Sequence, residues 1–157
     1  MIFLYMNLHE HFFKEEYIPL LNQLSDNEVG LWGVLSPQGM VEHMTDSIGI
    51  AYGRIQYTLQ TPEAMLPKVR AFALSDSQFK ENTKNSLMSE MPAPLRNHSM
   101  TEAITELEKE INLFIDYYKK NSGVTHLNPF FGEFNYNEWL HILYKHANHH
   151  LKQFNLL

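Results

Sequence analysis

The segment KHANHHLKQF, residues 145–154, holds three histidines within five positions. Two of them, His146 and His150, are four residues apart, so on a helix their rings project from one face and can bind one metal ion. On a helix that turns by about 100° per residue, both rings lie among apolar side chains, and His149 lies at the polar edge, where we expect it to be exposed. Buried imidazoles need polar partners. A metal ion would satisfy both rings at once; hydrogen bonds within the core are the alternative.

A third ligand is expected from another helix, and the segment MVEHMTDS supplies His43 at the margin of an apolar helix face. A marginal position suits a ligand at the mouth of a cavity. Three neutral histidines leave coordination positions open for water or substrate, as in catalytic metal sites. Three nearby side chains could orient the ligands by accepting their second ring N–H: Glu42, Asp46 and Gln153. The simpler interpretation is that the two carboxylates are solvated and that Gln153 bonds across the fold.

Four segments with helical spacing of apolar residues must position these side chains. The predicted helices span residues 7–24, 36–59, 99–123 and 135–154, and Thr61-Pro62 follows the second. Capping pairs mark three of the starts: Asn7 with Glu10, Ser99 with Glu102, and Asn135 with Glu138. The second start combines Ser36 as a cap with Pro37 in the first turn. The face of the last helix opposite the histidine pair is expected to be polar and carries His141, Lys145, Asn148 and Lys152.

Residues 61–98 form a long connection with four prolines between the second and third predicted helices. A long connection allows the helices it joins to run parallel, as a crossover. Ser75 could cap a short extra helix within it. No segment shows the sustained alternation of a strand. The sequence therefore predicts one all-α domain over residues 1–157, a four-helix bundle with a long crossover between helices two and three.

Composition limits the classes of function. With 12 Lys and Arg against 18 Asp and Glu, the net charge is −6, which disfavours binding to nucleic acid. The absence of cysteine excludes disulfides, cysteine-ligated zinc and a thiol nucleophile, and it fits a reducing compartment. The apolar start MIFLYM is too short for a signal sequence or membrane span, so we expect a packed extension, or translation from Met6. A cytoplasmic location without membrane contact is the expectation.

Other patterns carry weaker signals. In THLNPFFGEF, residues 125–134, Phe130, Phe131 and Phe134 are expected to close one end of the bundle; the alternative is a lid or an apolar pocket wall. A ferritin-like di-iron site needs two Glu-x-x-His motifs, and only Glu138 with His141 matches. The H-E-x-x-H motif of zinc proteases is absent.

The chain resembles the DinB/YfiT-like superfamily, and most of all a bacterial branch whose reaction is not established. The resemblance rests on HANHHLKQF, on NPFFGEFNYNEW before it, and on the lone histidine after SPQGMVE. It implies a four-helix bundle in up-down-down-up order whose metal is bound by His43, His146 and His150. Zinc or nickel is the expected metal, with iron or copper as alternatives.

Two functions remain open at this point. In characterised relatives the metal activates a thiol or substrate, so the resemblance implies a metal-dependent enzyme for a small molecule. A transferase or hydrolase that uses a low-molecular-weight thiol is the expectation. The alternative is a non-catalytic bundle, with or without a metal, which binds a protein partner or forms a homodimer. The enzyme requires a cavity beside the metal, whereas the binding protein predicts a closed or empty site.

Overall fold

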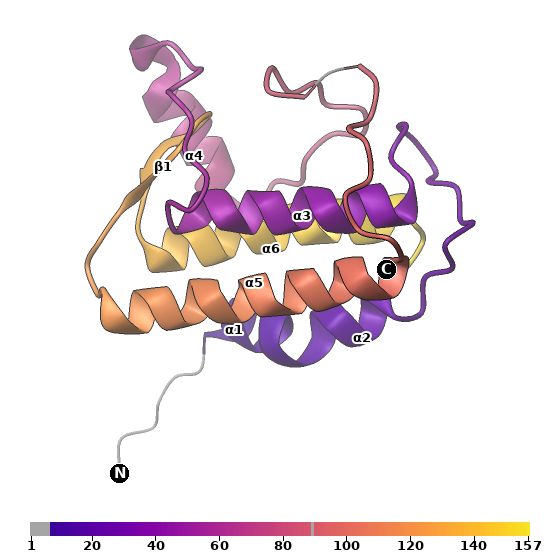
Figure 1. Ribbon diagram of the computed structural model, residues 1–157. Helices are drawn as coiled ribbons and strands as arrows, with labels where there is room; N and C mark the ends of the chain where they lie inside the picture. The colour runs from indigo at the N-terminus through magenta and orange to yellow at the C-terminus, as the bar shows by residue number, and fades with distance from the viewer. Residues whose placement is uncertain (1–6, 89) are drawn as a thin grey trace.

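A computed structural model describes residues 7–88 and 90–157, and its helices make up most of the fold (Figure 1). The predicted apolar extension MIFLYM lies outside the described residues. In chain order the elements are α1 (Leu8–His11), the π-helix η1 (Phe12–Glu16), α2 (Tyr17–Leu21), α3 (Pro37–Ala51), the 3-10 helix η2 (Glu63–Met65), α4 (Leu66–Leu74), α5 (Met100–Lys120), β1 (His126–Asn128), β2 (Gly132–Phe134) and α6 (Tyr136–Gln153).

Helix α3 lies beside both α5 and α6, η1 and α2 contact α5, and α1 contacts α6 (Figure 1). The core fills the space between them and is built from large apolar side chains such as Tyr17, Met44, Leu107 and Trp139. Burial of these side chains from every long helix stabilises the arrangement, at roughly 1.5–3 kcal/mol for each fully buried large side chain. Among the described residues, no helix has both the length and the apolar character needed to cross a bilayer.

The helices begin where the capping signals predict. At α6 the Asn135 side chain accepts the Glu138 N–H and the Glu138 carboxylate accepts the Asn135 N–H, which confirms the capping box. Ser99 caps α5 and Ser36 caps α3 through their hydroxyl oxygens. These starts are local contacts within three residues, which is why the sequence alone identifies them.

The first helical region starts at the predicted residue but without the predicted capping pair. Asn7 accepts the His9 N–H at 3.0 Å. Glu10 instead accepts a hydrogen bond from the hydroxyl of Tyr136, 2.8 Å away on α6. A tertiary contact therefore takes the carboxylate that the local pattern assigns to the cap.

Helix α3 ends at Ala51, well before the predicted Leu59, so that boundary was wrong. Gly53 has a φ of +82°, in the left-handed region that glycine adopts without strain and that commonly ends helices. The chain then turns back, and the guanidinium of Arg54 pairs with Glu110 on α5. A glycine within the predicted helix and a long-range ion pair thus decide the boundary.

The crossover holds a helix before Ser75 and not after it, so the predicted extra helix was misplaced. Helix α4 carries Pro67 in its first turn, a position that proline tolerates because the first N–H groups have no helical partner. The hydroxyl of Ser75 donates to the Phe72 carbonyl at the helix end. None of the described residues 75–88 and 90–99 lies in a helix or strand.

Lys145 is buried, although the helical projection places it on the polar face of α6. Only 3% of the surface of Lys145 is exposed to solvent. The ammonium donates to the carbonyls of Phe72, Ala73 and Ser75 at 2.7, 3.3 and 3.1 Å. These are carbonyls at the C-terminus of α4, where a positive charge is favourable. The face is covered because α4 packs on it, and a projection of α6 alone contains no information about that packing.

A two-stranded antiparallel sheet corrects the all-α prediction. Strands β1 and β2 pair with His126 opposite Phe134. The turn between them is closed by the Asn128 side chain, which accepts the N–H groups of Phe130 and Phe131. Each strand is three residues long, so neither can show the alternation by which strands are recognised in a sequence.

Candidate metal centre

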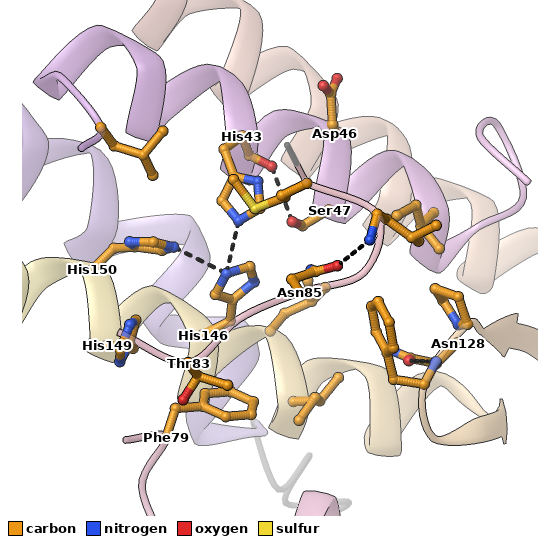
Figure 2. Close-up of a pocket in the computed structure, with 18 of the residues that line it drawn as sticks. His43, Asp46, Ser47, Phe79, Thr83, Asn85, Asn128, His146, His149 and His150 are labelled. Carbon is orange, nitrogen blue, oxygen red and sulfur yellow. Dashed lines mark hydrogen bonds between the residues drawn. The ribbon is translucent and has the colours of Figure 1, made fainter. Parts of the chain in front are cut away.

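Three imidazole rings from two helices meet beside the core (Figure 2). His43 comes from α3, and His146 and His150 come from successive turns of α6. The Nε2 atom of His146 lies 3.0 Å from the Nε2 atoms of both His43 and His150. One ligand nitrogen from each ring lies within 4.8 Å of the others. The spacing of four residues on α6 and the position of His43 on α3 bring the three side chains together.

The surroundings keep these rings neutral. Burial lowers the pKa of His43 from 6.5 to about 4. Burial also lowers the pKa of His150, to about 3, with a further contribution from the neighbouring His43. For the same reason the pKa of His146 lies well below its ordinary value. At neutral pH each ring therefore carries one N–H and one lone pair, the form in which histidine binds metals.

Gln153 determines which nitrogen of His150 carries the proton. Its amide Nε2 donates to the Trp32 carbonyl at 2.8 Å. The amide oxygen is therefore turned toward the Nδ1 atom of His150, 2.7 Å away. An amide oxygen can only accept, so Nδ1 carries the proton and the lone pair lies on Nε2, which faces the other two rings.

Direct hydrogen bonds do not pair the three Nε2 atoms well. With a lone pair on His150, the Nε2 of His146 must carry a proton to bond with it. That single N–H would then also have to serve His43, which lies equally close. A divalent cation that accepts one lone pair from each ring compensates all three nitrogens together. The three histidines could hold a metal ion, and the chemistry of this donor set fits one.

The carboxylates of Glu42 and Asp46 are directed toward the end of the crossover. Glu42 is 6% exposed, against the expectation of a solvated side chain. It accepts hydrogen bonds from the backbone N–H groups of Arg96 and Asn97. Burial raises the Glu42 pKa, but these bonds and those from the side chains of Gln38 and Asn97 outweigh it, so the pKa is lowered. Asp46 pairs with the Arg96 guanidinium at 3.1 Å.

Arg96 and Asn97 were missed at the sequence level. Arg96 pairs with Glu106 as well as Asp46, and so joins α3, the crossover and α5. Both residues stand in an irregular segment after two prolines, where no periodicity marks them. The pattern of carboxylates on α3 could have indicated a basic partner, but not which one.

A cavity of about 910 Å³ opens beside the three histidines. Its walls come from α3, α6, the residues around the turn at 128–131 and the crossover. Figure 2 shows Thr83 and Phe79 of the crossover near His146 and His149. His149 is half-buried, contrary to the expected exposure, because its ring packs near Trp32 and Phe79, with centroid distances of 5.4 and 6.1 Å.

The phenylalanines of residues 125–134 divide between the two roles considered for them. Phe134 is fully buried and its ring packs edge-on against Trp139, with 5.6 Å between centroids, as expected for closure of the core. Phe130 and Phe131 line the cavity. Phe130 and Phe131 lie in the turn that Asn128 closes, whereas Phe134 lies on strand β2 after the turn.

Comparison with known proteins identifies a family. Neither the curated proteins nor the solved structures gave a match. A family model described as the DinB superfamily matches residues 14–154, which include both helices that carry the three histidines. Over nearly its whole length, this chain belongs to the DinB superfamily.

Proposed function

We propose that this protein is a metal-dependent enzyme that binds its metal ion through His43, His146 and His150 and acts on a small molecule. The observation that carries the proposal is the convergence of three neutral imidazoles, one of them fixed by Gln153, at the wall of a large cavity. Zinc or nickel is the metal we favour, and iron or copper also suits three imidazoles.

The reaction class we propose is transfer or hydrolysis that uses a low-molecular-weight thiol. A bound divalent ion stabilises a thiolate or hydroxide near neutral pH and polarises a carbonyl. The protein's own contribution is positional. Gln153 accepts the Nδ1 proton of His150, so that the lone pair on Nε2 faces the metal site. Glu42 on α3, the helix that carries His43, holds residues 96–97 of the crossover against that helix. Apolar side chains such as Phe79 and Phe131 limit the access of water to the site.

For the fold we propose the up-down-down-up four-helix bundle that the family resemblance implies. The first helical region, α3, α5 and α6 would be its helices, with the crossover between α3 and α5. The contacts of α3 with both α5 and α6 support this assignment. In this arrangement α3 and α6 are neighbours, as a site shared between them requires.

The open cavity favours the enzyme over the non-catalytic binding protein. A site that only stabilises the fold is closed by a fourth protein ligand, whereas catalytic sites keep a position free. Three histidines beside a cavity of about 910 Å³ correspond to the second case. A homodimer is a separate prediction, which light scattering of the purified protein tests.

The test compares metal-loaded wild type with His146→Ala. Both are incubated with cysteine as the low-molecular-weight thiol, and with electrophilic and ester substrates. We expect calorimetry to show thiol binding, and substrate turnover to occur, only with the loaded wild type. A wild-type protein that holds one metal ion but neither binds thiols nor turns over any substrate of these classes would refute the proposal.

A further inference from the structure

We infer that the cavity accepts an amphipathic anion, a molecule with an apolar body and a single acidic group that faces the three histidines. This inference names the substrate class of the proposed enzyme and so rests on the proposed function. It follows from three features of the cavity wall: its apolar area, the pairing of its carboxylates, and the two lysines on it.

The body of the cavity is apolar. Aromatic and aliphatic side chains from the helices, the crossover and the turn line it, among them Ile50, Phe72, Phe79, Phe130, Phe131 and Leu143. Its volume of about 910 Å³ lies toward the upper end of the roughly 300–1,000 Å³ found for pockets that bind drug-sized molecules. A small thiol alone would leave most of this apolar surface in contact with water. A bound molecule with a hydrocarbon or aromatic body would cover it.

The polar side chains of the wall are largely committed to the protein itself. The Glu42 carboxylate accepts the N–H groups of residues 96–97, and Asp46 pairs with Arg96. The Ser47 hydroxyl donates to the His43 carbonyl at 2.9 Å. The Asn128 side-chain oxygen closes its own turn. These groups therefore offer few acceptors to a cationic or a many-hydroxyl ligand.

Two lysines carry the positive charge of the wall, although the chain is acidic, with a net charge of −6. The charged residues that line the cavity are Glu42, Asp46, Lys80, Lys84 and Arg96, and the Arg96 charge is balanced by Asp46 on the wall and Glu106 beyond it. Among the described residues, Lys80 and Lys84 form no ion pair. A divalent ion on three neutral histidines adds two further positive charges that no carboxylate of the wall is free to balance.

Both lysines line the same cavity as the three histidines. Lys84 stands between Thr83 and Asn85, and Figure 2 shows both of these residues on the crossover segment that passes His146. An acidic group that faces the metal ion would therefore share the cavity with both lysines. Its apolar body would extend toward Phe130 and Phe131.

The test uses four probes: octanoate, octanol, octyltrimethylammonium and acetate, each below the concentration at which it forms micelles. Binding to zinc-loaded and metal-free protein is measured by calorimetry, and zinc content is measured on the same samples. We expect loaded protein to bind octanoate at least tenfold more tightly than octanol, and octyltrimethylammonium most weakly. Acetate, which lacks the apolar body, should bind at least 100-fold more weakly than octanoate, since each buried methylene contributes about fourfold.

Variants separate the two ends of the cavity. The double variant Lys80→Ala/Lys84→Ala should weaken octanoate binding about five- to tenfold and leave octanol unchanged. Its control, Lys119→Ala/Lys120→Ala, removes the same charge from the end of α5, away from the cavity, and should change neither. Ile50→Trp narrows the cavity and should weaken both probes.

The outcomes distinguish this inference from the proposed function. Equal binding of octanol and octanoate to a zinc-loaded protein would overturn the inference and leave the metal site standing. So would a lysine double variant that binds octanoate as its control does. A wild type that takes up no zinc would instead refute the proposed metal site, whatever the probes show.

Discussion

Replacement of Gln153 by leucine should weaken metal binding without removing any ligand. The Gln153 amide accepts from His150 Nδ1 at 2.7 Å and donates to the Trp32 carbonyl at 2.8 Å. Leucine has a similar size but can do neither. The Nδ1 proton of a residue that is 5% exposed then loses its acceptor, and the ring is free to place its proton on the nitrogen that should bind the metal.

The expected loss is 10- to 100-fold in zinc affinity, the usual effect of removing a group that orients a ligand histidine. That corresponds to about 1.4–2.7 kcal/mol of binding free energy. Gln153→Glu separates the two contacts, because a carboxylate still accepts from His150 but cannot donate to Trp32. Zinc affinity in this variant should stay within a few-fold of wild type.

The assay is competition for zinc with a chromophoric chelator at pH 7.5. Gln56→Leu is the matched control, since the Gln56 amide makes an exposed hydrogen bond to the Gly53 carbonyl and does not line the cavity that holds the histidines. Circular dichroism checks that each variant keeps its helices. Two results would refute the reasoning: wild-type affinity in Gln153→Leu, or equal losses in the leucine and glutamate variants.

Three further predictions concern stability. The unfolding free energy of metal-free protein should fall as the pH falls from 6.5 toward 4. Burial lowers the His43 pKa from 6.5 to about 4. Between these pH values the unfolded chain binds a proton at His43 that the folded chain does not, so protonation favours unfolding. Urea unfolding should show this fall, with a smaller one in His43→Gln; a flat profile would contradict it. Lys145→Met should lower the unfolding free energy by about 1–3 kcal/mol and speed hydrogen exchange in α4, whereas the exposed Lys152→Met should do neither. Glu42→Gln should lower the unfolding free energy by a similar amount, because it weakens the hydrogen bonds to the backbone of residues 96–97. It should change zinc affinity less than threefold; a larger change would show that Glu42 acts on the metal site.

The sequence allowed prediction of features that depend on neighbours in the chain. The caps at Ser36, Ser99 and Asn135 are contacts over three residues, and His146 and His150 share a face because helix geometry fixes their spacing. The same projection put Lys145 on a polar face. The structure covers that face with the carbonyl end of α4, more than 70 residues earlier in the chain.

Most of the missed features depend on long-range contacts or on very short elements. The end of α3 combines a left-handed glycine with the pairing of Arg54 and Glu110. The two strands are too short to show a period. The role of Trp32 in the site is carried by its backbone carbonyl, which no side-chain pattern can reveal. Such features need the packing of distant segments, and only the three-dimensional structure supplies it.

The most direct test of the central claim is elemental analysis of protein purified without a histidine tag or added metal, with wild type and His146→Ala side by side. We predict about one metal ion per chain in the wild type. The variant should lose it while its circular dichroism spectrum stays helical. A wild type that carries no metal, even after incubation with zinc or nickel, would contradict the claim and leave the three histidines as partners in a hydrogen-bonded core.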